Sequence, residues 1–147
     1  MKFSCQVEIN APIDQVLERF VNPDNLKELQ DGFISHDHVS GNPGEKDAKS
    51  KFIYKSGRNT IELIETIRIN KLPEEFLALY EAKQMINTMS SSFTQIDESK
   101  TLYTSNLEYI SFHGFLPKLM AKLAPSMFQK QTQKWLDQFK EFVERTI

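Results

Sequence analysis

The chain has 147 residues, of which 39% are hydrophobic and 26% charged, with a formal net charge of -2. A domain of about 150 residues buries roughly 70% of the surface of its unfolded chain, so this length predicts one domain, residues 1–147, with its own core. The slightly negative charge gives no general attraction to phosphate backbones. Nucleic acid is therefore excluded as the expected partner.

The cysteine count and the N-terminal residues predict a cytoplasmic protein. Cys5 is the only cysteine, so no disulfide can form within the chain, which is typical of a reducing compartment. Met1 runs directly into a strand pattern, without the apolar block of a secretory signal. No stretch approaches the roughly 20 apolar residues of a membrane span, so we expect no stable membrane insertion.

The first segments predict one strand and two short helices. Residues 2–9 alternate between apolar and polar side chains, the period of a half-buried strand. Ala11-Pro12 ends this strand, and an apolar stripe over residues 13–20 predicts a short helix. Asn22-Pro23-Asp24 ends that helix and opens a second one, which carries apolar residues over 26–29.

Residues 33–112 predict six antiparallel strands. Turn signals rich in Gly, Pro, Asn, Asp and Ser divide the region at residues 41–44, 56–59, 71–74 and 97–100. Residues 75–96 contain no strong breaker, so turn chemistry allows one long strand or a hairpin near Lys83. The usual strand length of at most about 10 residues favours the hairpin.

Residues 114–147 predict helices, because apolar side chains recur at spacings of three and four. Pro117 and Pro125 do not fit a helix interior, so we expect a short leading helix and a long final helix that restarts near Pro125. The segment 112–123 has a strongly apolar stripe, and Lys118, Lys122, Lys130 and Lys134 stand on the polar side of the terminal helices. The segment could touch a membrane surface, but a core helix that covers the sheet is favoured.

Four segments carry a family resemblance. Residues 7–16 (VEINAPIDQV) and 20–26 (FVNPDNL) resemble the opening of the SRPBCC superfamily, which includes START domains, pathogenesis-related pollen allergens and polyketide cyclase-like proteins. The Gly-rich turn at 41–44 and residues 135–142 (WLDQFKEF) resemble its hairpin and closing helix. One departure is residues 26–30 (LKELQ), where relatives often carry a tryptophan.

The resemblance implies an α+β helix-grip fold. In this fold a seven-stranded curved antiparallel sheet wraps around a long C-terminal helix, with two short helices between the first two strands. The superfamily uses the space between sheet and helix as a cavity for hydrophobic ligands, whereas apolar alternation alone fits a solid core equally well.

Strand alternation and the helical stripe together give a set of residues expected to face this cavity. The predicted ligand-binding residues are Phe52, Tyr54, Leu63, Glu65, Met85, Asn87, Met89, Ser91, Tyr103, Leu107, Tyr109, Met120, Met127 and Trp135. For the strand near residue 78, alternation leaves two inward pairs open, either Leu77 with Leu79 or Phe76 with Tyr80.

Glu65 is the one weak candidate for a catalytic residue. It interrupts an apolar alternation that runs from Ile61 to Ile69. Burial would raise its pKa and let it act as an acid, a base or an anchor. The alternative is that a bulge exposes Glu65, or that Arg68 or a lysine pairs with it.

No cofactor or metal is predicted. His36 and His38 share one strand face, but no third ligand stands at a recognisable spacing. The sequence has no Walker, G-x-G-x-x-G or G-x-S-x-G pattern, so nucleotide binding and serine nucleophile chemistry have no support.

Three functions follow from these observations. The first is binding, or binding and transport, of a hydrophobic or amphipathic small molecule or lipid, favoured because no catalytic constellation is present. The second is a polyketide cyclase or dehydratase-like enzyme in which Glu65 or a tyrosine moves a proton. The third is a surface-interaction module with a filled core.

Overall fold

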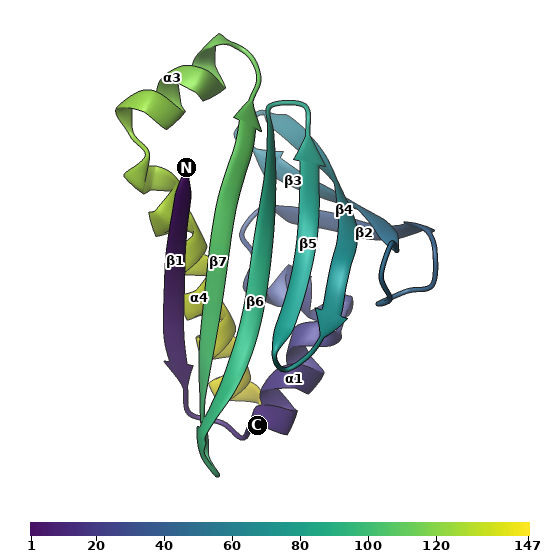
Figure 1. Ribbon diagram of the computed structural model, residues 1–147, viewed down its shortest axis with the longest axis vertical. Helices are drawn as coiled ribbons and strands as arrows, with labels where there is room; N and C mark the ends of the chain where they lie inside the picture. Colours follow the sequence, from purple (N-terminus) through teal and green to yellow (C-terminus); the bar gives the residue numbers. More distant parts are fainter.

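The structure is a computed structural model that covers residues 1–147 and combines one seven-stranded sheet with four α-helices (Figure 1). The strands are β1 (Lys2–Ile9), β2 (Phe33–Ser40), β3 (Lys49–Ser56), β4 (Asn59–Lys71), β5 (Glu75–Ala82), β6 (Met85–Asp97) and β7 (Lys100–Phe112). The helices are α1 (Ile13–Val21), α2 (Leu26–Leu29), α3 (Phe115–Leu123) and α4 (Ser126–Thr146), and a 3₁₀ turn (Pro23–Asn25) precedes α2. The six predicted strands, the hairpin between β5 and β6 and the break between the two C-terminal helices are confirmed.

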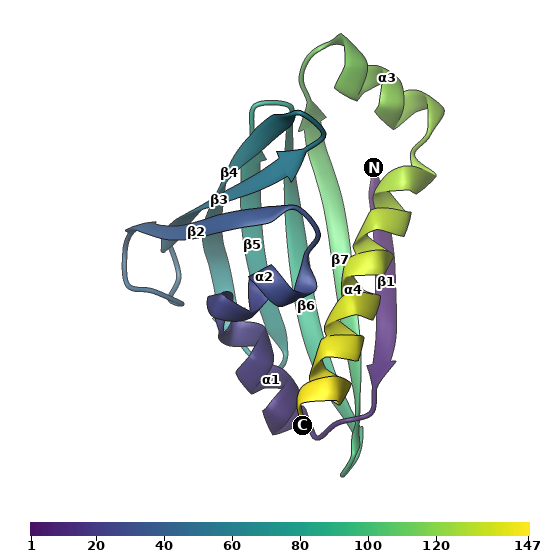
Figure 2. The same ribbon diagram turned by 180° about the vertical axis from the view of Figure 1, so that it is seen from behind.

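The sheet is an antiparallel meander with one long-range pairing. Its strand order is β1-β7-β6-β5-β4-β3-β2, and every neighbouring pair is antiparallel. Helices α1 and α2 carry the chain from β1 to the opposite edge, where β2 begins. Figures 1 and 2 show α1, α2 and α4 on the same side of the sheet, so one face is covered and the other is bare. We call these the helix-side face and the bare face.

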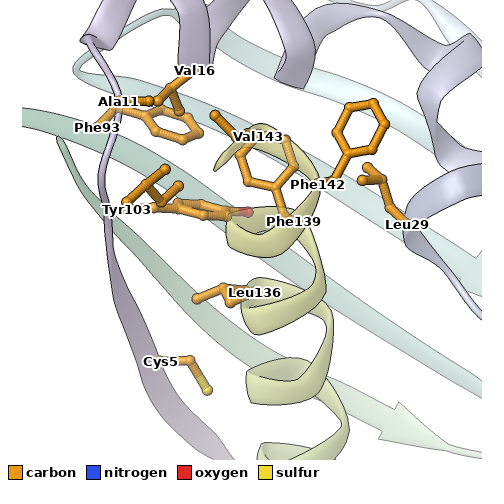
Figure 3. Close-up of a cluster of buried hydrophobic side chains, with 11 residues drawn as sticks. Cys5, Ala11, Val16, Leu29, Phe93, Tyr103, Leu136, Phe139, Phe142 and Val143 are labelled. Carbon is orange, nitrogen blue, oxygen red and sulfur yellow. The ribbon is translucent and has the colours of Figure 1, made fainter. Parts of the chain in front are cut away.

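The core fills the end of the sheet where α1 and the C-terminal half of α4 meet. Helix α4 runs along β1 and buries Leu136, Phe139 and Val143. The ring of Phe20 from α1 stands edge-on to Phe93 and Phe139, at centroid distances of 4.9 and 6.1 Å. Figure 3 shows Leu136, Phe139 and Val143 of α4 next to Phe93 and Tyr103 of the sheet. Burial of each such side chain contributes about 1.5–3 kcal/mol, which fixes α4 at this edge.

A bulge in β4 changes which side chains reach the helix-side face. Ile67 lies opposite Ala78, but the register then shifts, and Ile69 lies opposite Leu77. Neighbouring residues of a strand point to opposite faces, so the extra residue, Arg68, transfers Ile69 to the bare face. The alternation expected from Ile61 to Ile69 on one face is therefore wrong at Ile69.

Helix α3 does not cover the sheet. Pro117 falls in its first turn, where no helical hydrogen bond is lost, and Pro125 directly precedes α4. No residue of α3 is buried, so the expectation that residues 112–123 form a core helix is wrong. The reason is its place in the fold, because the chain leaves β7 at the end of the sheet and α3 lies beyond that end (Figures 1 and 2). No helix has the length and apolar character needed to cross a membrane.

Candidate functional site

A row of side chains crosses the helix-side face from β4 to β7. Glu65 in β4 lies opposite Tyr80 in β5, Tyr80 lies opposite Asn87 in β6, and Asn87 lies opposite Tyr109 in β7. Directly opposed residues of antiparallel strands point to the same face. The ring of Tyr109 is 5.0 Å from Phe128 of α4, which identifies this face as the helix side. The structure therefore brings the predicted residues Glu65, Asn87 and Tyr109 together.

Tyr80 binds the carboxylate of Glu65 within this row. Its hydroxyl donates a hydrogen bond of 2.8 Å to Glu65 Oε2. Burial raises the pKa of Glu65, and the hydrogen bond from Tyr80 opposes that rise. Burial and the Glu65 charge also hold the pKa of Tyr80 well above its ordinary value. Glu65 and Tyr80 thus form a partly buried pair that carries exchangeable protons.

Glu65 has no cationic partner. No lysine or arginine lies within ion-pair distance of it, and Arg68 is exposed. Both alternatives to a buried Glu65, exposure by a bulge and neutralisation by Arg68 or a lysine, are therefore wrong. The bulge falls after Glu65, so it leaves the carboxyl group on the helix side.

The two inward pairs left open for β5 are resolved by the same register. Phe76 lies opposite Ser91, and its ring is 5.8 Å from Phe20 of α1. Phe76 and Tyr80 therefore face the helices, while Leu77 and Leu79 face the bare side. The sequence did not single out Tyr80. It offered Tyr80 only as part of one of two possible inward-facing pairs of β5, because the composition of the strand favoured neither pair.

Below this row the helix-side face is filled. Phe93 and Tyr103 stack at 4.5 Å, and the hydroxyl groups of Tyr103 and Ser91 lie 3.2 Å apart. Burial raises the pKa of Tyr103 to about 12. Leu107 is buried here, and the buried hydroxyl of Ser105 has no partner within the protein. Of the predicted ligand contacts, Ser91, Tyr103 and Leu107 thus belong to the packed end of the face.

The predicted residues of β3 lie under α2. Tyr54 donates a hydrogen bond of 2.7 Å to Gln30 Oε1, at the end of α2. The rings of Phe52 and Tyr54 stack at 6.3 Å, and Phe52 is buried. Burial and the charge of Glu65 raise the pKa of Tyr54. The sequence did not predict the contact of Gln30 with Tyr54. A polar residue at the end of a short helix usually faces solvent, so its sequence position does not indicate a hydrogen bond to a distant strand.

One side of α4 forms the opposite wall. Phe128, Trp135 and Phe142 follow each other at seven residues, two helical turns, and so share that side. Phe128 packs on Tyr109, and Phe142 lies beside Leu29 of α2 (Figure 3). Trp135 between them is half-buried and has no aromatic partner. Part of this residue therefore remains accessible to solvent.

The remaining predicted contacts lie toward the α3 end. Met85 lies opposite Phe112, whose ring is 5.4 Å from Phe128, so Met85 extends the helix-side face. Met120 belongs to α3, which has no buried residue, and Met127 is exposed in the first turn of α4. The structure does not bring Met120 and Met127 to the row that contains Glu65.

Toward the α3 end, the side chains of the helix-side face are only partly buried. Leu63, Met89 and Asn87 are only half-buried, as are Glu65 and Tyr80. A hollow of about 400 Å³ lies at this end, between the β5–β6 turn and the start of α3. A second hollow of about 260 Å³ lies between the 3₁₀ turn and β2 and includes His36. The chain contains no group of three or more His, Cys, Asp or Glu that could hold a metal ion.

Comparison with solved structures identifies the architecture. The Zhui aromatase/cyclase from Streptomyces sp. R1128 matches with a TM-score of 0.82 at 9% identity, over 99% of this chain and 94% of that chain. TTHA0849 from Thermus thermophilus matches with a TM-score of 0.78 at 16% identity, over 99% of this chain and 98% of that one. The chain has the helix-grip fold. The predicted resemblance to SRPBCC proteins is thus confirmed as a likeness of fold.

One solved structure with this architecture contains bound small molecules. Norcoclaurine synthase from Thalictrum flavum, solved in complex with dopamine and hydroxybenzaldehyde, matches with a TM-score of 0.71 at 11% identity, over 100% of this chain and 88% of that chain. No protein-family model matches the sequence, and no curated protein matches it by sequence. For this helix-grip domain, function must therefore be argued from the helix-side face itself.

Proposed function

We propose that the protein binds a hydrophobic or amphipathic small molecule or lipid between the helix-side face and α4. Support comes from one observation above all. The apolar residues Leu63 and Met89 are only partly buried, on a face that also carries the partly buried pair of Glu65 and Tyr80. Covering such a surface is favourable by roughly 25 cal/mol per Å² of apolar area, and the polar pair supplies the orientation.

Each group has a defined role in this proposal. Leu63, Met89 and the ring of Trp135 contact the apolar part of the ligand. Glu65 is the polar anchor, since a protonated carboxyl group donates a hydrogen bond to a ligand carbonyl and an ionised one accepts from a hydroxyl. Asn87, beside Tyr80 in the same row, offers an amide that does both.

We place this role in the cytoplasm, with the bound molecule carried by the protein without a cofactor. Cys5 is buried and free, which suits a reducing compartment. We place the entry of the ligand toward the α3 end, where the side chains of this face are only partly buried.

Two measurements test the proposal. The first is native mass spectrometry of gently purified protein, which should reveal a bound hydrophobic mass. The second is titration with the fluorescent probe 8-anilinonaphthalene-1-sulfonate.

A pair of variants shows where the probe binds. Asn87 points to the helix side and Thr88 to the bare face, so the variants Asn87→Trp and Thr88→Trp add the same ring on opposite faces. Asn87→Trp should weaken probe binding at least tenfold, and Thr88→Trp should leave it unchanged. Equal binding by both variants, with no co-purifying mass, would contradict the proposal.

A second candidate is an acid–base enzyme that acts on a bound carbonyl compound. The raised pKa of Glu65 favours it, because a carboxyl group that titrates nearer to neutral pH can exchange a proton with a ligand. Several structures of the same fold are aromatase/cyclases, including the two-domain StfQ and BexL. Glu65→Gln separates the two functions. For an enzyme it should keep ligand binding and abolish turnover of the bound compound, whereas in a pure binder no turnover exists to be lost.

A further inference from the structure

Helix α3 is apolar on one side, and that side is not used in the fold. Phe115, Leu116 and Leu123 are 82%, 62% and 70% exposed. At 100° per residue these three side chains and Leu119 lie on one side of the helix. No residue of α3 is buried, in contrast to α4, whose apolar stripe forms the core. The demands of folding therefore do not explain the apolar side of α3.

Positive charge gathers around the same helix. Between Glu108 and Asp137 the sequence has no acidic residue, although the whole chain has a net charge of -2. Lys118 and Lys122 are four residues apart and lie along one border of the apolar side of α3. Both are exposed, and neither forms an ion pair.

The β5–β6 turn adds a third cation to this surface. Lys83 and Gln84 line the hollow of about 400 Å³ together with the residues that begin α3, from His113 to Pro117. Lys83 is exposed and forms no ion pair. The turn and the helix thus form one continuous region, which we call the α3 surface: Lys83, Phe115, Leu116, Lys118, Lys122 and Leu123.

We infer that the α3 surface docks the protein on an anionic lipid bilayer. The apolar side chains of α3 enter the boundary between headgroups and acyl chains, and the three lysines face the lipid phosphates. With nine residues α3 lies in the plane of the membrane and does not cross it. This inference does not depend on the proposed ligand.

The charge pattern distinguishes a bilayer from a second copy of the chain. A two-fold dimer through the α3 surface would place the same patch against itself, so Lys118 and Lys122 would face a partner's lysines. Like charges at that distance oppose association, whereas an anionic membrane attracts each lysine by an energy equivalent to about a fivefold change in binding.

Vesicle co-sedimentation of the full chain tests the inference. The protein should bind vesicles that mix phosphatidylglycerol with phosphatidylcholine, bind pure phosphatidylcholine far more weakly, and lose binding as salt is raised. The double variant Phe115→Ser/Leu116→Ser should weaken binding at least tenfold. The double variant Lys118→Glu/Lys122→Glu should weaken it roughly 25-fold or more.

Matched controls lie at the opposite edge of the sheet. Ile34 in β2 is 51% exposed, and Lys46 is an exposed lysine in the β2–β3 loop. Ile34→Ser and Lys46→Glu should bind vesicles like the unmodified protein. All variants should keep the same circular dichroism spectrum and melting temperature, because every substituted residue is exposed.

Three results would overturn the inference. These are no binding to anionic vesicles, equal binding to neutral vesicles at all salt concentrations, and a dimer in lipid-free solution that Phe115→Ser/Leu116→Ser converts to monomer. The last result would assign the α3 surface to a protein interface.

Discussion

Tyr80 and Glu65 face each other across β4 and β5, joined by a hydrogen bond of 2.8 Å from the phenol to the carboxylate. Two neighbouring strands therefore hold this carboxyl–phenol pair on a surface of apolar, amide and tyrosine side chains. Burial acts on both groups in the same sense, favouring the neutral carboxyl and the neutral phenol. The hydrogen bond partly restores the carboxylate, so the pair responds to pH, to a ligand and to mutation as a unit.

The raised pKa of Glu65 makes stability depend on pH. A carboxyl group whose pKa is higher in the folded state stabilises the fold fully below its unfolded pKa, near the ordinary value of 4.5, and loses that contribution as pH rises through the folded pKa. Glu65→Gln removes the loss. The free energy of unfolding of the variant should match that of the unmodified protein near pH 4 and exceed it increasingly toward pH 8.

Urea denaturation at successive pH values measures this difference. Glu81→Gln is the control, because Glu81 is exposed on the same strand as Tyr80 and forms no ion pair. Its stability should follow the unmodified protein at every pH. A gap between Glu65→Gln and the unmodified protein that stays constant from pH 4 to pH 8 would show that Glu65 does not titrate differently on folding.

Tyr80→Phe isolates the hydrogen bond from the ring. The change leaves the packing of the ring in place and removes the donor to a charged acceptor, which should cost about 1.5–3 kcal/mol of unfolding free energy at neutral pH. Because the bond lowers the pKa of Glu65, its loss should raise that pKa further. Carboxyl chemical shifts recorded by NMR against pH would detect the change.

A double-mutant cycle and a second tyrosine give the controls for Tyr80. In the Glu65→Gln background the cost of Tyr80→Phe should fall, since the acceptor is then neutral. Tyr103→Phe removes a hydroxyl that lies 3.2 Å from Ser91 and should leave the Glu65 titration unchanged. Additive energies throughout the cycle would mean that the two side chains act independently.

The sequence predicted the order of the elements because their signals are local. Turn residues fixed the strand ends, and Pro125 marked the restart of the final helix. Strand alternation also placed Glu65 and Asn87 on the correct face. These features depend on backbone conformations that each short segment favours by itself.

Features set by long-range pairing could not be predicted in the same way. The bulge at Arg68 transfers Ile69 to the bare face, and only the register against β5 shows it. Tyr80 became the partner of Glu65 through that same register. The exposure of α3 depends on where β7 ends relative to the sheet. An apolar stripe has the same sequence pattern in a core helix and in a surface helix, so the pattern alone does not distinguish them.

Thr101 joins two segments that lie far apart in the sequence. Its fully buried hydroxyl donates a hydrogen bond of 2.9 Å to the carbonyl of Ala11, which follows β1. Thr101→Val preserves the shape and leaves that carbonyl unsatisfied, so it should cost about 1–3 kcal/mol in thermal or urea unfolding. Thr104→Val, half-buried on the same strand and without a side-chain hydrogen bond, is the matched control and should change stability little. Equal effects of the two substitutions would assign the cost to strand packing.

Trp135 and Phe139 are one helical turn apart on α4. Truncation to alanine should mainly lower stability at Phe139 and mainly weaken probe binding at Trp135. Phe139 is 5% exposed and stands edge-on to Tyr103 and Phe20, so Phe139→Ala leaves a cavity and should cost about 3–5 kcal/mol of stability. Trp135 is half-buried with no aromatic partner, so Trp135→Ala should cost far less stability yet weaken binding of 8-anilinonaphthalene-1-sulfonate severalfold. Denaturation and probe titration of both variants separate the two effects. If Trp135→Ala proved as destabilising as Phe139→Ala, the ring would belong to the core, and the wall proposed opposite Glu65 would have no free aromatic side chain to offer a ligand.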